Sequence, residues 1–217
     1  MKKLQLYFLI MIVWAFGSVM YAQSDTMKTV RVGTQTWTQY NLSVSTFRNG
    51  DTILKATNKK EWEAANRAKK PAWCYYNFDS EKAATYGVFY NFYAVSDSRG
   101  LAPGGFHIPV TEEWRKMQEF VQTTYKGDEG KFVKQVKTWK GGVKATNETG
   151  LSFLPSGLAN WDGLFPYKNT HAYFWTANPL TPKNEAFYAF FPNGSERIYL
   201  QRDLDPGCGM SVRCIKD

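Results

Sequence analysis

Few residues of this chain are suited to acid–base chemistry. The two histidines, His107 and His171, are the candidate general bases, and hydrolysis would need such a base beside a nucleophile or a second carboxylate. His107 lies in a tight turn before an expected helix, where a hydrogen bond that fixes the turn is the simpler interpretation. His171 follows two polar residues and is expected at the surface. Two histidines alone do not form a metal site, so we expect no catalytic residue and no metal centre.

Three loop carboxylates could ligate calcium. Asp203 and Asp205 flank Leu204, and Asp162 lies in an earlier loop. Hard cations bind several oxygen ligands, which carboxylates and loop carbonyls supply. A solvated acidic loop is the simpler interpretation of the same residues. We therefore expect no cofactor, and calcium remains an unsupported alternative.

The aromatic content is the one hint of a ligand. The chain holds 8 Trp, 13 Tyr and 15 Phe, more than a core of this size needs. Sugar rings stack their apolar faces on exposed aromatic side chains, while Asn and Asp bond the hydroxyls. Trp161 lies between Asn160 and Asp162, and Tyr167 and Tyr173 follow closely. We expect these five residues to bind a ligand; the alternative is that most of these rings fill the core.

The N-terminal segment has the pattern of a secretory signal. Lys2 and Lys3 precede a mostly apolar run over residues 4–19, and Ala22 ends the segment before polar residues. The run is shorter than the ~20 residues of a membrane-spanning helix, although an anchoring span is the alternative interpretation. We expect residues 1–22 to be a cleaved signal peptide, with no transmembrane span afterwards. The protein would then be exported to the periplasm, the cell surface or the medium.

The remaining chain suits a single domain. Residues 23–217 number 217 − 22 = 195, enough to bury a sizeable core. We expect residues 23–29 to be flexible and residues 30–217 to form the domain. Loss of Lys2 and Lys3 lowers the net charge from +8 to +6. The basic residues are scattered among acidic ones, so we expect a solvated surface and no nucleic-acid partner; attraction to acidic polysaccharide or a cell surface is the alternative.

The cysteines allow one disulfide. Export permits oxidation, and three cysteines form one bond and leave one thiol. Met210, Val212 and Cys214 alternate as in a strand, which would separate Cys214 from Cys208. The pattern therefore slightly favours a disulfide between Cys74 and Cys214. The chain has no Cys-x-x-Cys motif, and structural zinc is not expected.

A helix with Thr111 as its N-cap is the clearest element of the sequence. Pro109 ends the preceding segment, Thr111 is a good N-cap, and two glutamates bring negative charge to the first turn. One apolar stripe follows, made of Trp114, Met117 and Val121. We also expect a buried helix over 89–95 and short helices within 56–70 and 130–136.

The second half of the chain is typical of strands. The expected strands lie at 30–32, 36–37, 71–76, 151–157, 172–176, 186–191, 197–200 and 211–215, with a hairpin turn at Asn193-Gly194. Helices in the first half and strands in the second predict an α+β fold. Two main helices would pack on antiparallel strands from the C-terminal half.

Several motifs together resemble a known bacterial family. In chain order they include Gly33-Thr34-Gln35-Thr36-Trp37, Tyr90-Asn91-Phe92-Tyr93-Ala94-Val95, Gly105-Phe106-His107-Ile108-Pro109, Glu113-Trp114, Thr146-Asn147-Glu148-Thr149-Gly150 and Ser211-Val212-Arg213-Cys214. This order resembles the Fibrobacter succinogenes major paralogous domain over residues 30–217. Phe92, Phe106 and Phe174 stand where that family usually or commonly has Trp, and Val110 where it has a small polar residue.

The resemblance implies a fold and a compartment. It implies export by a bacterium and a C-type-lectin-like core related to the formylglycine-generating enzyme group. The oxidase chemistry of that group needs reactive cysteines. Here Cys74 and Cys214 lie in motifs that look structural and only Cys208 is spare, so we expect no enzyme. The family has no firmly assigned activity.

We therefore expect an exported, non-catalytic binding module that recognises a glycan or a cell-surface protein. The alternative is a structural or interaction subunit of a bacterial envelope assembly, which a large apolar patch without a groove would favour. An enzyme would need a cleft that joins His107 to two carboxylates.

Overall fold

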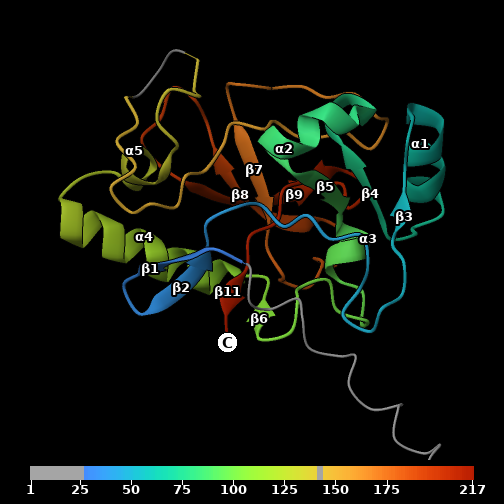
Figure 1. Cartoon of the computed structure of the whole chain (residues 1–217), viewed down its shortest axis with the longest axis horizontal. Coiled ribbons are helices and arrows are strands. Elements are labelled where there is room, and N and C mark those ends of the chain that lie inside the picture. Colours follow the sequence, from blue (N-terminus) through green and yellow to red (C-terminus); the bar gives the residue numbers. More distant parts are fainter. Residues whose placement is uncertain (1–26, 141–143) are drawn as a thin grey trace, which may run out of the picture.

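The structure is a computed structural model that describes residues 27–140 and 144–217 (Figure 1). The expected signal peptide, 1–22, and most of the segment 23–29 lie outside the described residues. Within the described ranges, every helix is too short or too polar to cross a bilayer. The fold is a mixed α+β arrangement, as the sequence predicts, and the described residues form three small sheets.

The first sheet joins the two ends of the domain. Its order is β1-β2-β11-β6, formed by Thr29–Val32, Gln35–Thr38, Ile215–Lys216 and Phe106–His107. All neighbours are antiparallel, and Ile215 lies between Trp37 of β2 and His107 of β6. Figure 1 shows the C-terminus emerging beside β2 and β6. The two strands expected at 30–32 and 36–37 are confirmed, and they pair antiparallel.

The second sheet corrects the predicted helix over 89–95. Its order is β10-β5-β4-β3, formed by Gly209–Met210, Val88–Asn91, Ala72–Tyr75 and Leu54–Lys55. Residues 88–91 form β5 in the middle of this sheet, and only Phe92–Val95 forms a helix, α3. Strand pairing on both sides holds the apolar run extended. The Asn91 side chain then caps α3 by accepting a hydrogen bond from the Ala94 amide at 3.1 Å.

The third sheet lies between the helices. Its antiparallel strands are β7 (Ala172–Trp175), β8 (Ala186–Phe191) and β9 (Tyr199–Leu204). Residues 192–198 join β8 to β9, so the strand expected at 197–200 begins two residues later and runs longer. Two other expected strands are mostly irregular: 151–157 makes isolated bridges at Phe153 and Gly157, and 211–215 pairs through its last residue and an isolated bridge at Ser211.

Helix α4, Thr111–Tyr125, packs against β8 as predicted. Its stripe of Trp114, Met117 and Val121 is fully buried. The helix starts one residue earlier than expected: Val110 is the N-cap, because the Glu113 carboxylate accepts a hydrogen bond from its amide at 2.9 Å. Thr111 instead donates its own amide to Asn178 Oδ1 at 2.8 Å.

The other helices are short and peripheral. They are α1 (Lys59–Arg67), α2 (Ala83–Tyr86) and α5 (Glu129–Val133), with single 3-10 turns at Tyr76–Phe78 and Ser80–Lys82. The second main helix is therefore α1, which packs on β4 of the second sheet rather than on strands of the C-terminal half. Figure 1 shows α4 and α5 at one end of the long axis and α1 at the other.

The predicted disulfide between Cys74 and Cys214 is wrong. Cys74, Cys208 and Cys214 are all buried free thiols. Side chains alternate between the faces of β4, so Trp73 enters the largest core cluster while Cys74 points to a smaller one beneath α1. Cys214 belongs to the largest cluster. The two thiols thus lie in different parts of the core, where a bond could not form without backbone movement.

Candidate functional site

An open group of aromatic rings lies on the face of the third sheet that points away from α4. We call it the aromatic surface and define it as Tyr167, His171, Tyr173, Phe190 and Tyr199. Strand register assembles it, because Phe190 lies opposite Tyr173 on one side and Tyr199 on the other. The alternate residues of the same strands, including Phe174 and Phe191, pack beneath α4.

The rings of the aromatic surface contact one another. Tyr173 and Phe190 stack with centroids 4.8 Å apart, and His171 lies nearly parallel to Phe190 at 5.4 Å. Tyr167 adds a further ring 4.9 Å from His171. Exposure rises from the middle outward: Tyr173 is 8% exposed, Tyr199 is 38% and Tyr167 is 50%. The surface therefore has a buried base and an accessible rim.

The aromatic surface carries no formal charge at neutral pH. Burial, and then the charge of Lys134, lower the pKa of His171, which keeps the imidazole neutral. Burial raises the pKa of Tyr173. Next to it, burial and a hydrogen bond to Asp203 raise the pKa of Tyr188, whose hydroxyl donates to Asp203 Oδ1 at 2.8 Å. The surface thus offers ring faces and hydroxyl groups rather than ions.

Helix α5 fixes the 192–198 loop, which leads into Tyr199. The buried Glu129 carboxylate accepts hydrogen bonds from the Ile198 amide at 2.8 Å and from Gln118 at 2.7 Å. The Gly130 amide donates to the Glu196 carbonyl. Because its partners come from both α4 and the loop, α5 holds the start of β9 in one position.

Lys134 fixes the same loop from its first half. Its side chain is 1% exposed, and its Nζ donates to the carbonyls of Pro192 at 2.9 Å and Ser195 at 2.8 Å. The amine also lies 4.4 Å from the Trp139 ring. Burial lowers the pKa of Lys134 to about 8, partly offset by the charge of Glu196. The loop is therefore held by buried polar groups at both ends.

The five predicted binding residues fall into two groups. Tyr167 and Tyr173 belong to the aromatic surface, with centroids 6.0 Å apart. Asn160, Trp161 and Asp162 instead form the tip of a loop over α1. Trp161 is 46% exposed, as expected for a binding residue, but among the described residues its ring pairs with no other.

Backbone contacts hold that loop tip in place. Trp62 Nε1 donates to the Asn160 carbonyl at 2.8 Å, and Asn66 donates to the Trp161 carbonyl at 3.2 Å. Asp162 Oδ1 accepts a hydrogen bond from the Leu164 amide at 3.3 Å. The backbone of Asn160 and the side chain of Asp162 thus shape the turn.

Three members of the aromatic surface are not among the binding residues predicted from the sequence. His171 was considered only as a base, and Phe190 and Tyr199 only as strand residues. The available signal was the aromatic alternation Tyr188, Phe190 followed by Tyr199 across an Asn-Gly turn. That signal identifies a shared face only once the strand register is known.

His107 lies between two carboxylates. Its Nδ1 is 2.7 Å from Asp217 Oδ1 and its Nε2 is 2.8 Å from Glu113 Oε1. Burial opposes protonation, but the hydrogen bonds to Asp217 and Glu113 prevail and raise the pKa of His107. Both ring nitrogens are occupied, so no lone pair faces a substrate proton. The arrangement ties β6 to α4 and to the last residue.

The loop carboxylates considered for calcium have protein partners. Asp203 accepts the Tyr188 hydroxyl, and Asp205 Oδ1 accepts the Gly207 amide at 2.7 Å. Within residues 27–140 and 144–217, no three His, Cys, Asp or Glu side chains are grouped so that they could hold a metal ion. Calcium therefore gains no support from this geometry.

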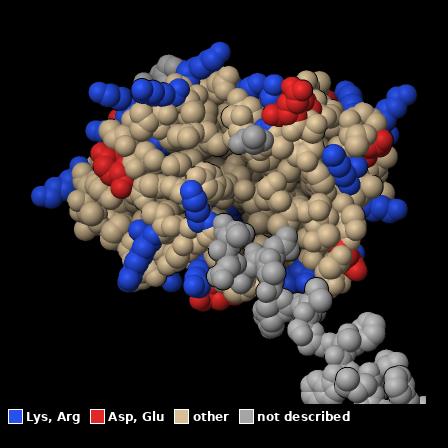
Figure 2. Space-filling model, viewed as in Figure 1, with Lys and Arg blue, Asp and Glu red and all other residues tan. Residues whose placement is uncertain are grey.

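The basic excess is dispersed. Figure 2 shows Lys and Arg side chains spread around the edge of one face, with acidic residues among them. Several of these side chains form exposed ion pairs, such as Arg115 with Glu112 at 3.0 Å. Dispersed charge of this kind is typical of a solvated surface.

The chain belongs to the Fibrobacter succinogenes major domain family, whose family model matches residues 30–216. The resemblance drawn from the sequence motifs is thereby confirmed. No curated protein and no solved structure matches the chain. The family name states no activity, so the function has to be argued from the surface of this domain.

Proposed function

As a member of this family, the protein is, we propose, an exported, non-catalytic module that binds a glycan chain on the aromatic surface. The observation that carries the proposal is a cluster of uncharged rings that are buried at the base and accessible at the rim. Aromatic rings of this kind supply contact area at little cost in side-chain entropy. Sugar rings can stack their C–H faces on them.

Polar groups suited to hydroxyls surround these rings. The Tyr199 hydroxyl lies 3.2 Å from Ser195 Oγ, and the Tyr188 hydroxyl donates to Asp203. A neutral polyhydroxylated ligand would form hydrogen bonds there with the hydroxyl groups and with the exposed Asp203 carboxylate. The fixed 192–198 loop lowers the ordering cost of binding, because Tyr199 is already in place.

We further propose that the domain has a C-type-lectin-like core. The segment from His107 to Trp114 supports this by its resemblance to the helix start of the formylglycine-generating enzyme group. The pairing of β2 with β11, which closes the domain at its ends, supports it as well. Superposition of an experimental structure on C-type-lectin-like domains would test the proposal; a different strand order in the common core would contradict it.

A structural or interaction subunit of an envelope assembly is the second candidate. The observation in its favour is the loop tip over α1, where Trp161 is 46% and Leu164 is 54% exposed. Exposed apolar side chains close together in sequence can serve as an anchor for a protein partner. In this case the partner would be a protein of the cell surface, and the loop tip rather than the aromatic surface would bind it.

Binding measurements on single variants separate these candidates. The protein, expressed from its full sequence and exported, would be tested against soluble and insoluble polysaccharides beside Tyr199→Ala and Trp161→Ala. We expect Tyr199→Ala to weaken glycan binding about tenfold through the loss of one stacking ring. Tyr40→Ala is the matched control, because Tyr40 is 59% exposed and lies outside the aromatic surface.

The outcomes discriminate clearly. Binding that Tyr199→Ala weakens and Trp161→Ala leaves unchanged supports the aromatic surface. Binding lost only in Trp161→Ala moves the site to the loop tip over α1. If no polysaccharide binds, the glycan proposal fails and cross-linking on intact cells would be used to find a protein partner.

A further inference from the structure

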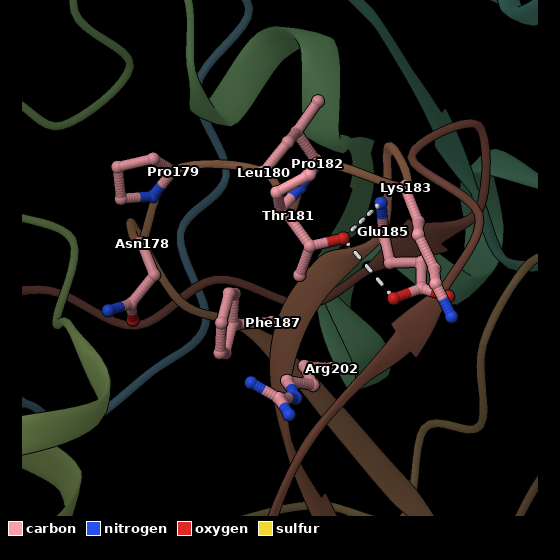
Figure 3. Close-up of a pocket in the computed structure, with 9 residues that line it drawn as sticks. All are labelled: Asn178, Pro179, Leu180, Thr181, Pro182, Lys183, Glu185, Phe187 and Arg202. Atoms are coloured by element: carbon pink, nitrogen blue, oxygen red, sulfur yellow. Dashed lines mark hydrogen bonds between the residues drawn. The ribbon is translucent and has the colours of Figure 1, made fainter.

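A pocket lies on the other side of β8 from the aromatic surface. The connection from β7 to β8, residues 176–185, lines this open pocket together with side chains of β8 and β9, and its volume is about 530 Å³ (Figure 3). Its lining includes Asn178, Leu180, Lys183, Glu185, Phe187 and Arg202. Phe187 points into this pocket, whereas its neighbour Tyr188 lies on the opposite face of the strand. This volume is in the range of small-molecule sites, ~300–1,000 Å³.

The walls of the pocket are fixed by hydrogen bonds. Asn178 Oδ1 accepts from the Thr111 amide of α4 at 2.8 Å and from Thr176 Oγ1 at 2.9 Å. At the other end, Thr181 Oγ1 accepts from the Glu185 amide at 3.1 Å and donates to Glu185 Oε2 at 3.2 Å. Figure 3 shows both Thr181–Glu185 bonds as dashed lines. The cavity is therefore part of the folded loop, anchored on α4.

Two cations and one carboxylate belong to this lining. Lys183 and Arg202 are exposed, and in the part of the chain that the structure describes neither forms an ion pair. The one acidic side chain, Glu185, has an oxygen committed to Thr181. The pocket thus has a net positive charge and two cationic groups with capacity for an anion.

The apolar side chains of the lining limit which class of anion fits the pocket. Phe187 and Leu180 form its sides, together with two prolines. In Figure 3 Arg202 lies on the side of Phe187 away from Thr181. An inorganic anion would leave the ring unused, and a purely apolar ligand would desolvate the cations without partners. A ligand with both a carboxylate and an apolar ring face satisfies both parts.

We propose that this pocket binds a sugar acid, a uronate unit of an acidic glycan. The guanidinium of Arg202 presents paired donors that match a carboxylate, and Lys183 adds a point charge. Phe187 packs on the C–H face of the sugar ring, while Glu185 and the Asn178 amide bond its hydroxyls. The inference goes beyond the proposed function, because it adds a site for an acidic sugar on the face of β8 away from the aromatic surface. The net charge of +6 that remains without Lys2 and Lys3 acts in the same direction by attracting an acidic polymer.

The test compares an acid with its uncharged ester. Titration calorimetry would measure the binding of tri-galacturonate and of its methyl ester, which keeps the rings and removes the charge. We expect the ester to bind about tenfold more weakly, and Arg202→Gln to weaken binding of the acid by about the same factor while leaving the ester unchanged. Binding of the acid should also weaken with added salt. Arg67→Gln on α1 is the matched control, an exposed arginine outside the pocket.

Each result decides the inference separately from the proposed function. If acid and ester bind equally, or if Arg202→Gln has no effect, the pocket proposal is overturned, while a loss of neutral glycan binding in Tyr199→Ala would keep the aromatic surface. If Arg202→Gln weakens the acid and Tyr199→Ala weakens no glycan, the pocket stands and the aromatic surface fails. Absence of binding to any acidic or neutral glycan overturns both.

Discussion

At the scale of single residues, Arg213 forms the most hydrogen bonds of the buried charged side chains that the structure describes. Its guanidinium donates to the carbonyls of Thr38 at 2.7 Å and Leu151 at 3.0 Å and to Asn41 Oδ1 at 2.7 Å. The same group lies 4.7 Å from the Phe153 ring. It thereby joins β2, an irregular segment and the approach to the last strand.

Replacement of Arg213 should therefore strongly destabilise the domain. Arg213→Met leaves several buried oxygens without a donor, and we expect a loss of about 3 kcal/mol or more in the free energy of unfolding. Arg213→Lys should recover little, since an ammonium cannot reproduce the planar fork. Urea denaturation measures both, with Arg67→Met as the exposed control. A loss below about 1 kcal/mol in Arg213→Met would contradict this role.

Lys134 makes the free energy of unfolding depend on pH in the alkaline range. Because burial lowers its folded pKa to about 8, below an unfolded value near ~10.4, the folded state binds this proton less readily. The Lys134 contribution is therefore present above the unfolded pKa and is lost as pH falls through about 8. We expect the unfolding free energy of the wild type to gain, from pH 8 to pH 10, an increment that Lys134→Met lacks.

The difference in unfolding free energy between the wild type and Lys134→Met isolates the effect of this lysine. Tyrosines and other lysines titrate in the same range, but they do so equally in both. Urea denaturation at several pH values gives the two curves. Parallel curves from pH 8 to pH 10 would show that the Lys134 amine does not titrate differently in the folded state.

At the scale of elements, α5 contacts the 192–198 loop at Gly130. Replacing this glycine by alanine has two opposing effects on stability, one through helix propensity and one through steric overlap. Alanine is favoured over glycine in a helix by ~1 kcal/mol, so Gly130→Ala in α5 should stabilise on propensity alone. A Cβ at Gly130, however, would overlap the Glu196 carbonyl, whereas one at Gly194 would meet nothing within 4 Å. We expect Gly130→Ala to lower the melting temperature and to weaken glycan binding by displacing Tyr199.

Gly194→Ala is the matched control on the other side of that contact. It lies in the loop itself but leaves the contact with α5 intact, so its melting temperature should stay near that of the wild type. Differential scanning calorimetry compares the three proteins. If Gly130→Ala melts at or above the wild-type temperature, helix propensity prevails and the loop is not held as described.

Whether an element could be predicted from the sequence depended on the periodicity of its apolar residues. The stripe of Trp114, Met117 and Val121 predicted the buried face of α4, because one polar face distinguishes a helix from a strand. The run from Val88 to Val95 is apolar on almost all sides, Asn91 excepted, so periodicity cannot separate a buried helix from a central strand. Its strand state follows from pairing with β4 and β10, which are distant in sequence.

The candidate site was predictable only in part for the same reason. Tyr167 and Tyr173 are close in sequence and were found together. Phe190 and Tyr199 join them through the register of β7, β8 and β9. The disulfide prediction failed on a related point, since alternation along β4 places Cys74 on the face away from Cys214, and sequence spacing carries no information on faces of different strands.

At the scale of the whole molecule, the domain is closed where its ends meet. β2 from the start of the domain pairs with β11 from its end, and β11 also pairs with β6. His107 of β6 adds a polar contact to the same closure, because its ring bridges Glu113 at the start of α4 and Asp217. Loss of this bridge should act on the stability of the whole fold rather than on one loop.

The bridge predicts a pH dependence opposite in sign to that of Lys134. The hydrogen bonds to Asp217 and Glu113 raise the pKa of His107 despite its burial, so the folded state binds this proton more tightly than the unfolded chain. The stabilisation is fully present below the unfolded pKa, ~6.5, and is lost as pH rises through the folded value.

The other histidine, His171, has a lowered pKa and contributes the opposite slope, stability lost as pH falls. We expect His107→Gln to remove a decline in melting temperature between pH 6 and pH 8, and His171→Gln to make that decline steeper. Since the ring of His107 is 40% exposed, solvent screens the effect and a shift of a few degrees is the expected scale. Melting curves of the three proteins across this range, at constant ionic strength, decide the matter: a decline that persists in His107→Gln would assign the pH dependence to groups outside the bridge.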